Sequence, residues 1–336
     1  MRNTTFCNII ADMKLGIAGS GNIVPVFLDA YREAFASPVY ALCGREKSRA
    51  RLEELKQSFE IGKIFTDYEE MLRDPVLTAV YVALPNTLHF EYARKALLAG
   101  KHVLLEKPFT VTMEEAEELY RIAEDRGLTL YENVSTTASP NLKIVRTWLP
   151  EIGPVRVVTA NYSQYSSRYD AFLSGVTAPA FDPAMKGGAL RDLGVYPLQL
   201  IVSLFGAPER VAAEGHFQRG VDTSAALLLN YGSFLAAALA SKETDGQSGF
   251  VIQGERGRIV SDSAPNYMEE VRLVKDGKTE VRDGRSYKNR LTPCLRIFAA
   301  AADGKSRLPA CYRENTLAVL DIVLQAEARL KEQQEG

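Results

Sequence analysis

Two adjacent charges, Glu106 and Lys107, interrupt a run of core-type residues in the stretch 103-VLLEKPFTV-111. A charge beside such a run costs free energy unless it has a partner or a function. A lysine ammonium group can polarise the oxygen of a substrate, and a neighbouring carboxylate can orient that ammonium group. Whether this pair can do so depends on the element that it follows and on the edge of the sheet where it lies.

The residues before the pair belong to a series of short apolar runs that alternate with helical patterns between residues 14 and 130. The runs are LGIAG (15–19), VYALCG (39–44), AVYVALP (79–85), HVLLE (102–106) and LTLYEN (128–133). This alternation predicts βαβ units and a doubly wound parallel sheet, class α/β, buried on both faces. Thr112 and Glu115 fit a capping box at the start of one helix. Because such sheets bind ligands at the carboxyl ends of their strands, Glu106 and Lys107 are predicted to lie at a binding site.

The second half of the chain has long stretches of alternating apolar and polar residues instead. They cover 155–167, 209–218, 223–232, 233–242, 250–263 and 268–284. Turn signals between several of them predict hairpins in an open, mostly antiparallel sheet. One helix at about 189–205 interrupts these strands, and a terminal helix is expected at 312–333.

This change of pattern predicts three parts of the chain. Residues 1–13 form an N-terminal extension, residues 14–134 a dinucleotide-binding Rossmann domain, and residues 135–336 an α+β domain for substrate binding and oligomerisation. The terminal helix is a candidate for packing back on the first domain.

The composition is that of an ordinary globular protein, with 46% hydrophobic and 24% charged residues among 336. Its 40 basic and 42 acidic residues leave a net charge of -2, and no long block of one sign occurs. This distribution argues against nucleic acid or a membrane surface as a partner and favours a small molecule. The four cysteines are scattered, and only three histidines occur. No metal site is therefore expected, and the thiols are predicted to be reduced, as in a cytoplasmic protein.

The turn 19-GSGNIV-24 lies between the first predicted strand and a helix. Gly19 permits a tight turn, Gly21 lets backbone N–H groups approach a pyrophosphate, and the helix N-terminus adds a positive dipole. Val24 stands where a third glycine or an alanine is usual. The turn predicts dinucleotide binding, and an ordinary strand-to-helix connection is the alternative.

The end of the second strand indicates which dinucleotide is bound. A carboxylate there would bind the ribose diol of NAD, but the strand ends Cys43-Gly44-Arg45, and Glu46 comes later than expected. Arg45, with Ser48, can instead meet a 2′-phosphate, so NADP is favoured and NAD stays open. The alternative is that these are solvated charges at a helix start.

Pro85 and Asn86 end another strand at the ligand edge, and His89 begins the next helix, where it is either a cofactor contact or a packed capping residue. The candidate cofactor-binding residues are Gly19, Ser20, Gly21, Asn22, Ile23, Gly44, Arg45, Ser48, Pro85, Asn86, His89, Glu106 and Lys107.

Three segments in this order, GSGNI, ALPNTLHFEYARKALLAGKHVLLEKP and 187-GGALRDLGVYPLQL-200, resemble the glucose-fructose oxidoreductase, inositol dehydrogenase and rhizopine catabolism (Gfo/Idh/MocA) family. The resemblance covers nearly the whole chain from Met13 onward. It implies a Rossmann domain, a second α/β domain whose open sheet often forms a homodimer or homotetramer interface, and NAD(P)-dependent hydride transfer on sugars, polyols or diols.

The resemblance also implies roles for three residues. Lys107 matches the lysine of the family's Glu-Lys-Pro motif beside the nicotinamide, and Pro108 a proline that often follows a cis peptide bond. Asp192 matches an acidic residue that touches the substrate. Tyr196, at i+4 from Asp192 and thus on the same helix face, stands where many members have histidine, as in the dihydrodiol dehydrogenase-like branch. We predict that Lys107, Asp192 and Tyr196 are catalytic, with Lys107 stabilising the ionised phenol of Tyr196.

One segment departs from the family. The small residues of 135-STTASPNLK-143 replace an aromatic residue and an arginine or histidine, which predicts a different pocket wall and leaves the substrate open. Tyr162, Tyr165 and Arg168 are candidate substrate contacts, although such tyrosines are also common in sheets. The predicted activity is a dehydrogenase or reductase of a sugar, polyol or cyclic diol. A regulator or sensor without turnover, or a reductase of a non-sugar carbonyl or imine, are the alternatives.

Overall fold

The apolar runs of the first half form one parallel sheet. In the computed structural model, which describes residues 13–335, the sheet has the strand order β3-β2-β1-β4-β5-β6. Its strands are β1 (Leu15–Ala18), β2 (Ala41–Cys43), β3 (Lys63–Phe65), β4 (Ala79–Val82), β5 (His102–Glu106) and β6 (Leu130–Asn133). The order reverses between β1 and β4, and ligands bind at such a switch point in doubly wound folds.

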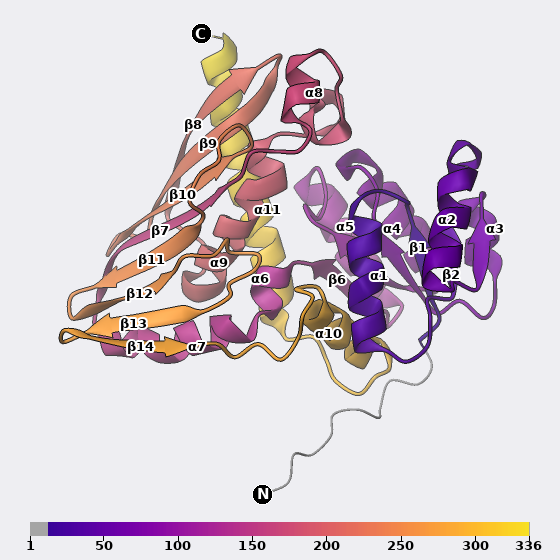
Figure 1. The fold of residues 1–336 in the computed structure, drawn as a ribbon, viewed down its shortest axis with the longest axis horizontal. Helices are drawn as coiled ribbons and strands as arrows, with labels where there is room; N and C mark the ends of the chain where they lie inside the picture. The colour runs from indigo at the N-terminus through magenta and orange to yellow at the C-terminus, as the bar shows by residue number, and fades with distance from the viewer. Residues whose placement is uncertain (1–12, 336) are drawn as a thin grey trace, which may run out of the picture.

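Helices cover both faces of this sheet (Figure 1). One face packs on α1 (Ile23–Ala34), α2 (Arg49–Phe59) and α10 (Thr292–Ala302). The other packs on α3 (Tyr68–Arg73), α4 (His89–Leu98) and α5 (Met113–Asp125). Because both faces are covered, β1, β4 and β6 are buried along their whole length, as their apolar sequences predict. The capping box of Thr112 and Glu115 at the start of α5 is confirmed.

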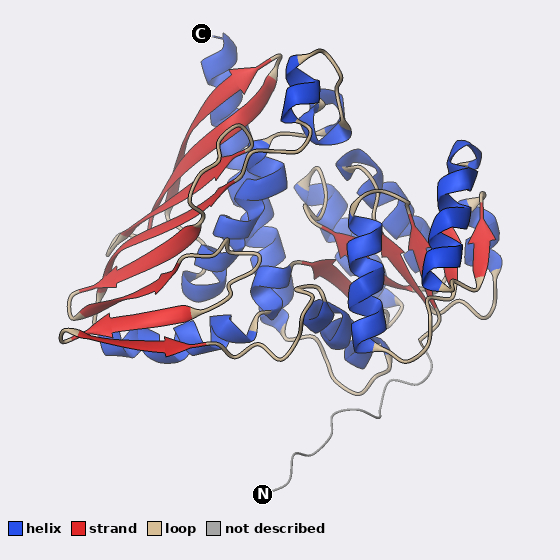
Figure 2. Cartoon of the chain, in the orientation of Figure 1, coloured by secondary structure: helices blue, strands red, loops and turns tan. Residues whose placement is uncertain are grey.

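The second half forms an eight-stranded sheet, order β14-β13-β12-β11-β7-β10-β9-β8 (Figure 2). Its strands are β7 (Val155–Ser163), β8 (Arg210–Gln218), β9 (Val221–Asn230), β10 (Leu235–Ser241), β11 (Gly249–Gly254), β12 (Gly257–Ser261), β13 (Val271–Lys275) and β14 (Lys278–Arg282). The pair β7 and β10 is parallel and the other pairs are antiparallel. The predicted fold class is confirmed.

Two long helices lie on the inner face of this sheet, between it and the first domain (Figure 1). They are α9 (Val195–Phe205) and α11 (Ala310–Glu335), and α11 contacts β8 on one side and α5 and β6 on the other. The segment before α9 is a π-helical turn, η6 (Leu190–Gly194), which carries Asp192. Hence Asp192 and Tyr196 do not lie on one regular helix, although the sequence predicted a single helix there.

The remaining elements are short and connect the larger ones. They are α6 (Ser135–Ala138), α7 (Pro140–Trp148), α8 (Tyr169–Leu173) and the 3-10 turns η1 (Glu46–Ser48), η2 (Asn86–Leu88), η3 (Leu149–Ile152), η4 (Pro179–Phe181) and η5 (Pro183–Met185). The expected N-terminal extension lies, except for Met13, outside the described residues. No helix among residues 13–335 has the length and apolarity needed to cross a lipid bilayer.

A buried arginine joins the two halves close to the ligand edge. Arg191 is 1% exposed, and its guanidinium donates to Glu327 of α11 (Nη2 to Oε2, 2.8 Å) and to the carbonyl oxygen of Thr110 (3.1 Å). These contacts tie η6 to the loop that follows β5. The residue after Arg191 is therefore held against the segment that carries Lys107.

Candidate active site

The first strand-to-helix turn has the geometry of an anion site. Gly19 has φ +127°, and a Cβ atom there would lie 2.1 Å from the carbonyl oxygen of Ala83, so only glycine fits. A Cβ atom at Gly21 would meet nothing within 4 Å, so the space above this residue is open. Asn22, the N-cap residue of α1, makes no side-chain cap, which leaves first-turn N–H groups for a ligand. This turn fits the pyrophosphate of a dinucleotide.

Arg45 follows β2 at the same edge and is exposed. The neighbouring pair Arg49 and Glu46 is joined at 2.6 Å (Nε to Oε1), so Glu46 is already bonded. Arg45 has no ion-pair partner among residues 13–335, and Ser48 is bonded to it through the backbone. The end of β2 thus offers a guanidinium group, which fits a 2′-phosphate better than a ribose diol.

His89 is a packed residue in this structure, which favours the second of the two interpretations that the sequence left open. The residue is fully buried, and its ring nitrogens lie 2.8 Å from the carbonyl oxygens of Leu84 and Pro108. It therefore fixes the loops after β4 and β5 to each other. Asn86 donates from Nδ2 to the carbonyl oxygen of Lys186 (2.8 Å), so it also links the first domain to a loop of the second.

Lys107 lies at the centre of the ligand edge, directly after β5. Its Nζ donates to the backbone oxygen of Asp192 (2.7 Å) and to Asp192 Oδ1 (2.8 Å). The peptide bond to Pro108 is cis, as the resemblance implied. Since an ammonium group has three N–H donors, one stays free of bonds to the described residues and can reach a reacting oxygen.

A second lysine holds the other oxygen of Asp192. Lys242, at the end of β10, lies 2.9 Å from Asp192 Oδ2, and its side chain is 2% exposed. Burial raises the pKa of Asp192, but Lys107 and Lys242 outweigh this effect and hold the pKa well below its usual range. Burial likewise lowers the pKa of Lys107, and the carboxylate of Asp192 more than offsets it. Lys107 and Asp192 therefore stay an ionised pair. Burial lowers the pKa of Lys242, and the carboxylate of Asp192 opposes this effect.

Glu106 lies in a hydrogen-bond network at the ends of three strands, and its contact with the cofactor stays a prediction. It is 7% exposed, and Oε1 accepts from the hydroxyl of Tyr81 and from Asn133 Nδ2 (2.6 Å). Its carboxylate makes no hydrogen bond to Lys107. It fixes the ends of β4, β5 and β6 and acts on Lys107 only as a nearby charge.

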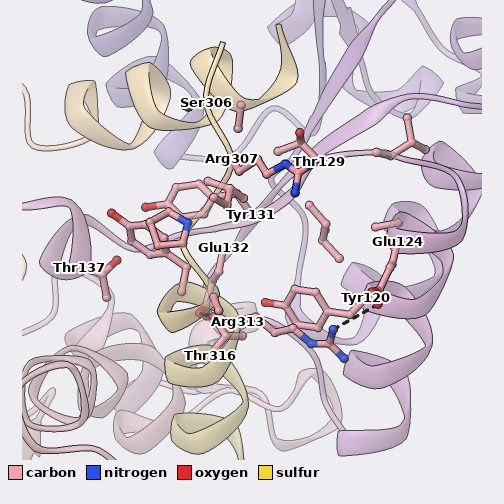
Figure 3. A pocket seen from close by; sticks show the side chains of 18 of the residues that line it. Tyr120, Glu124, Thr129, Tyr131, Glu132, Thr137, Ser306, Arg307, Arg313 and Thr316 are labelled. Carbon is pink, nitrogen blue, oxygen red and sulfur yellow. Dashed lines mark hydrogen bonds and ion pairs between the residues drawn. The ribbon is translucent and has the colours of Figure 1, made fainter. Parts of the chain in front are cut away.

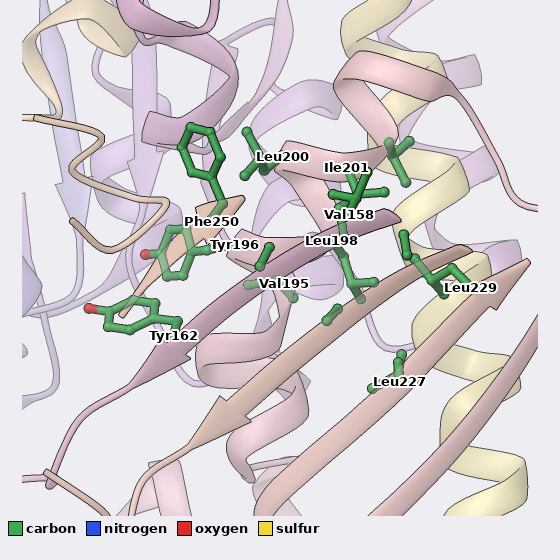
Figure 4. Packing of buried hydrophobic residues seen from close by; sticks show 14 of the residues in the cluster. Val158, Tyr162, Val195, Tyr196, Leu198, Leu200, Ile201, Leu227, Leu229 and Phe250 are labelled. Atoms are coloured by element: carbon green, nitrogen blue, oxygen red, sulfur yellow. The ribbon is translucent and has the colours of Figure 1, made fainter. Parts of the chain in front are cut away.

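Tyr196 of the second domain lies beside this cluster, and Figure 4 shows it next to a second tyrosine, Tyr162. The Lys107 Nζ lies 5.2 Å from the ring centroid of Tyr196, and the rings of Tyr196 and Tyr162 are 5.5 Å apart. Both hydroxyls point the same way, out of the hydrophobic cluster. Tyr162 is bonded to Asn266 (3.1 Å) and Gln164 (3.2 Å), whereas the Tyr196 hydroxyl has no hydrogen-bond partner among the described residues. Burial raises the pKa of Tyr162 to about 12, so this phenol stays protonated.

Two other predicted substrate contacts lie around α8 and reach Lys242 indirectly, because Tyr165 packs on Tyr169, Tyr169 on Phe181, and Phe181 lies under Lys242. Tyr165 donates to Asp170 Oδ1 and packs on Tyr169, and Arg168 is the N-cap residue of α8. None of the contacts of these side chains joins them to Lys107, Asp192 or Tyr196. Their role in substrate binding stays a prediction.

The unusual 135–143 segment is helical and largely engaged in structural bonds. Ser135 donates to the carbonyl oxygen of Asn266 (2.8 Å) and Thr136 to that of Pro265 (3.1 Å). These small side chains therefore hold the loop after β12, and that loop supplies the Asn266 bond to Tyr162. The segment shapes the site through this loop.

Sequence reasoning missed Lys242, Asn266 and Arg290. Arg290, in the loop before α10, approaches Ser135 (Nη1 to Oγ, 3.4 Å) and lies close enough to Tyr196 to act on it electrostatically. Lys242 had a usable signal, because it is the charged last residue of the largely apolar stretch 233–242, just as Lys107 follows an apolar strand. Asn266 and Arg290 lie in irregular loops and had no such signal.

A second buried carboxyl lies one strand away from Glu106. Glu132 on β6 is 7% exposed and accepts from Thr316 (2.8 Å) and Gln199 (3.1 Å), both neutral donors. Burial raises its pKa from 4.5 to about 7. Of the nearby charges, Glu106 raises this pKa and Lys107 lowers it, and burial dominates.

This carboxyl is expected to make the stability of the protein depend on pH. Between 4.5 and about 7 the folded protein holds a proton on Glu132 that the unfolded chain has lost, so the free energy of unfolding falls as pH rises through this window. The slope contributed by one group is at most about 1.4 kcal/mol per pH unit. Denaturant unfolding at several pH values measures this effect. The free energy of unfolding should fall less with pH in Glu132→Gln than in the wild type. The control, Glu91→Gln at an exposed position, should keep the wild-type slope. Equal slopes for all three proteins would contradict the assignment.

Both halves of the chain match models of known protein families. Residues 13–134 match the model of an oxidoreductase family with an NAD-binding Rossmann fold, named GFO_IDH_MocA, and residues 150–260 match the GFO/IDH/MocA C-terminal domain. The chain is 38% identical to scyllo-inositol 2-dehydrogenase (NADP(+)) IolU of Bacillus subtilis over 80% of this chain and 81% of that protein. It is 31% identical to trans-1,2-dihydrobenzene-1,2-diol dehydrogenase of Sus scrofa over 73% and 72% of the two chains.

A solved structure has the same fold over almost the whole chain. It is KijD10, a 3-ketoreductase from Actinomadura kijaniata, in complex with NADP and TDP-benzene. The TM-score is 0.84 at 25% identity, and the match covers 95% of this chain and 98% of that one.

Proposed function

Because the chain belongs to the Gfo/Idh/MocA family of oxidoreductases, we propose that it transfers hydride between NADP and a ring hydroxyl or carbonyl group of a polyol, sugar or cyclic diol. That it is an NAD(P)-dependent dehydrogenase or reductase follows from the family and from its relatives. The substrate class is the proposal. It is supported by the cluster of Lys107, Asp192 and Tyr196 at the ligand edge of the sheet.

The residues present fit NADP. The open turn at Gly21 and the uncapped start of α1 would hold the pyrophosphate, and the exposed Arg45 would meet the 2′-phosphate. When bound, the cofactor supplies or accepts the hydride. The alternative of a sensor without turnover finds no support in the site, since a lysine, a carboxylate and a phenol converge there.

The residues of the cluster have separate tasks in this proposal. Tyr196 gives a proton to the reacting oxygen in reduction and takes it in oxidation, since its hydroxyl has no other described partner. Lys107 donates its remaining N–H to the same oxygen and stabilises negative charge there. Asp192, held by Lys107 and Lys242, keeps the ammonium group of Lys107 in place and is within reach of a neighbouring substrate hydroxyl.

The proposal predicts a specific activity profile. The purified protein with NADP should oxidise one or more of scyllo-inositol, myo-inositol, D-xylose and a trans-dihydrodiol, with NADPH absorbance as the readout. The rate with NADP should exceed the rate with NAD, because the guanidinium group of Arg45 recognises the 2′-phosphate. Reduction assays with NADPH and the corresponding ketones, together with imines, separate the polyol class from imine reduction. Cofactor binding without turnover on every substrate would contradict the proposal and favour a sensor.

We also propose that the chain forms a homodimer or homotetramer through the outer face of the second sheet. No helix of residues 13–335 covers this face (Figure 1), and it exposes Val157, Leu228, Leu235 and Leu239, each 40–48% accessible. The double variant Leu228→Lys and Leu239→Lys should be monomeric by light scattering after size-exclusion chromatography. Val76→Lys, an equally exposed position of the first domain, should keep the wild-type mass. A monomeric wild type would contradict the proposal.

A cytoplasmic location is likewise proposed, supported by the free thiols of Cys43, Cys294 and Cys311.

A further inference from the structure

A cavity of about 610 Å³ lies along the free edge of β6. Its walls come from β6, α5, the segment between α10 and α11, and the start of α11. The polar side chains that matter here are Tyr120, Glu132, Gln199, Arg307, Arg313 and Thr316. Lys107, Asp192 and Tyr196 do not line it. Its volume is in the range of small-molecule sites in proteins.

The cavity wall around Glu132 offers buried hydrogen-bonding groups without a cation. Glu132 and Thr316 are 7% and 5% exposed, and the Glu132 carboxyl is bonded to the neutral donors Thr316 and Gln199. Gln199 Oε1 and the Tyr131 hydroxyl are buried and have no hydrogen-bond partner among the described residues. Buried polar atoms are nearly always satisfied in folded proteins, so unpartnered atoms beside a cavity point to a bound polar group.

The other walls are basic. Figure 3 shows Arg307 next to Thr129 on one side and Arg313 with Tyr120 on the other, with Glu132 between them. Arg313 lies 5.0 Å from the ring centroid of Tyr120 and 3.5 Å from the exposed Glu124, whereas Arg307 has no ion-pair partner among residues 13–335. The first turn of the 26-residue helix α11 adds its positive dipole on this side.

We propose that this cavity is a second ligand site, which binds a small hydroxylated anion. The carboxylate or phosphate group lies against Arg307 and the start of α11, and hydroxyl groups bond to Glu132, Thr316 and Gln199. A bare anion would leave the buried polar groups without partners, and a neutral polyol would leave Arg307 without one. Only a molecule with both kinds of group satisfies both sets of side chains.

The proposed ligand site shares structural elements with the active site. β6 pairs with β5 in the register Asn133 to Glu106, and Gln199 lies three residues after Tyr196 on α9. α11 packs against elements of both domains. A ligand that contacts β6, α9 and α11 at once therefore bridges the two domains that supply Lys107, Asp192 and Tyr196, and we expect it to be an effector of the enzyme.

The test measures binding to the full-length protein with NADP present, by calorimetric titration. The probes are 6-phospho-D-gluconate and D-gluconate, which carry both an anion and hydroxyl groups, and inorganic phosphate, which carries only the anion. We expect both hydroxylated anions to bind more tightly than inorganic phosphate. Arg307→Ala should weaken their binding by about tenfold or more, because it removes a charge-assisted hydrogen bond, and Thr316→Val should weaken it less.

Arg121→Ala is the matched control, since Arg121 is an exposed arginine of α5 that does not line the cavity. Arg307 is itself exposed, so its variant is expected to fold, and a thermal melt checks this. The affinity of the Arg121 variant should equal that of the wild type. Binding that Arg307→Ala leaves unchanged, affinity for inorganic phosphate equal to that for the hydroxylated anions, or no binding of either anion in the millimolar range would each overturn the proposal.

Discussion

Replacing Lys107 by methionine is expected to lower the turnover number by about 10²–10⁴-fold, while NADPH still binds. The Nζ atom is the donor that faces the reacting oxygen in our proposal, and two of its three N–H groups are already fixed by Asp192. Its position is therefore set before the substrate arrives, and methionine keeps the length of the side chain while removing the donor and the charge. Steady-state rates and NADPH fluorescence titrations measure the two effects separately.

Two further variants show whether the loss comes from Lys107 itself. Lys107→Arg keeps the charge but changes the donor geometry, so it should recover only a small part of the activity. Lys95→Met, at an exposed lysine of α4, should have wild-type rates. Because Asp192 keeps its ion pair with Lys242, the Lys107 variant is expected to fold. Wild-type turnover in Lys107→Met would exclude a direct role of the ammonium group in the reaction.

Tyr196→Phe is expected to lower the turnover number by a similar factor, about 10²–10⁴-fold, which is the usual contribution of a general acid or base. The ring packs against Tyr162 and is 5% exposed, so phenylalanine should keep the packing. The hydroxyl has no hydrogen-bond partner among the described residues, so its removal should leave the melting temperature nearly unchanged. Pre-steady-state rates of hydride transfer are the appropriate measurement.

Tyr162→Phe is the matched control for this prediction. Its ring lies 5.5 Å from that of Tyr196, but its hydroxyl is bonded to Asn266 and Gln164, and burial raises its pKa to about 12. A phenol held in this way is a poor proton acceptor, so the variant should lose far less activity. The opposite result, with Tyr162→Phe inactive and Tyr196→Phe active, would assign the proton transfer to Tyr162.

Much of the first domain could be predicted from the sequence because residues within each segment indicate which strand or helix that segment forms. The strands β1, β2, β4, β5 and β6 fall within the five apolar runs, and the capping box of α5 is where the residue types indicated. The exception is β3, three residues at the edge of the sheet that are only partly buried. A strand of that kind lacks the continuous apolar run that marked the others.

The second domain shows the limit of the same reasoning. Hairpin signals predicted its antiparallel pairs, but β7 lies between β10 and β11 and pairs with β10 in parallel. That arrangement joins strands distant in sequence, and no turn residue encodes it. The π turn at Leu190–Gly194 was also unexpected, because the sequence there has an ordinary helical pattern. The contacts of Arg191 and Asp192 with other elements help to hold this turn.

The sequence by itself determined the α/β class, because the class follows from local residue patterns. It also predicted the dinucleotide turn, a cation at the end of β2, and the three site residues Lys107, Asp192 and Tyr196, each from a residue type at a local position or from the family resemblance. Only the tertiary structure decided the partners of those residues. It placed Lys242 on Asp192, turned Glu106 and His89 into structural contacts, and formed the cavity beside β6. The physical reason is that a partner is fixed by packing between elements far apart in the chain, whereas an element is fixed by its own residues.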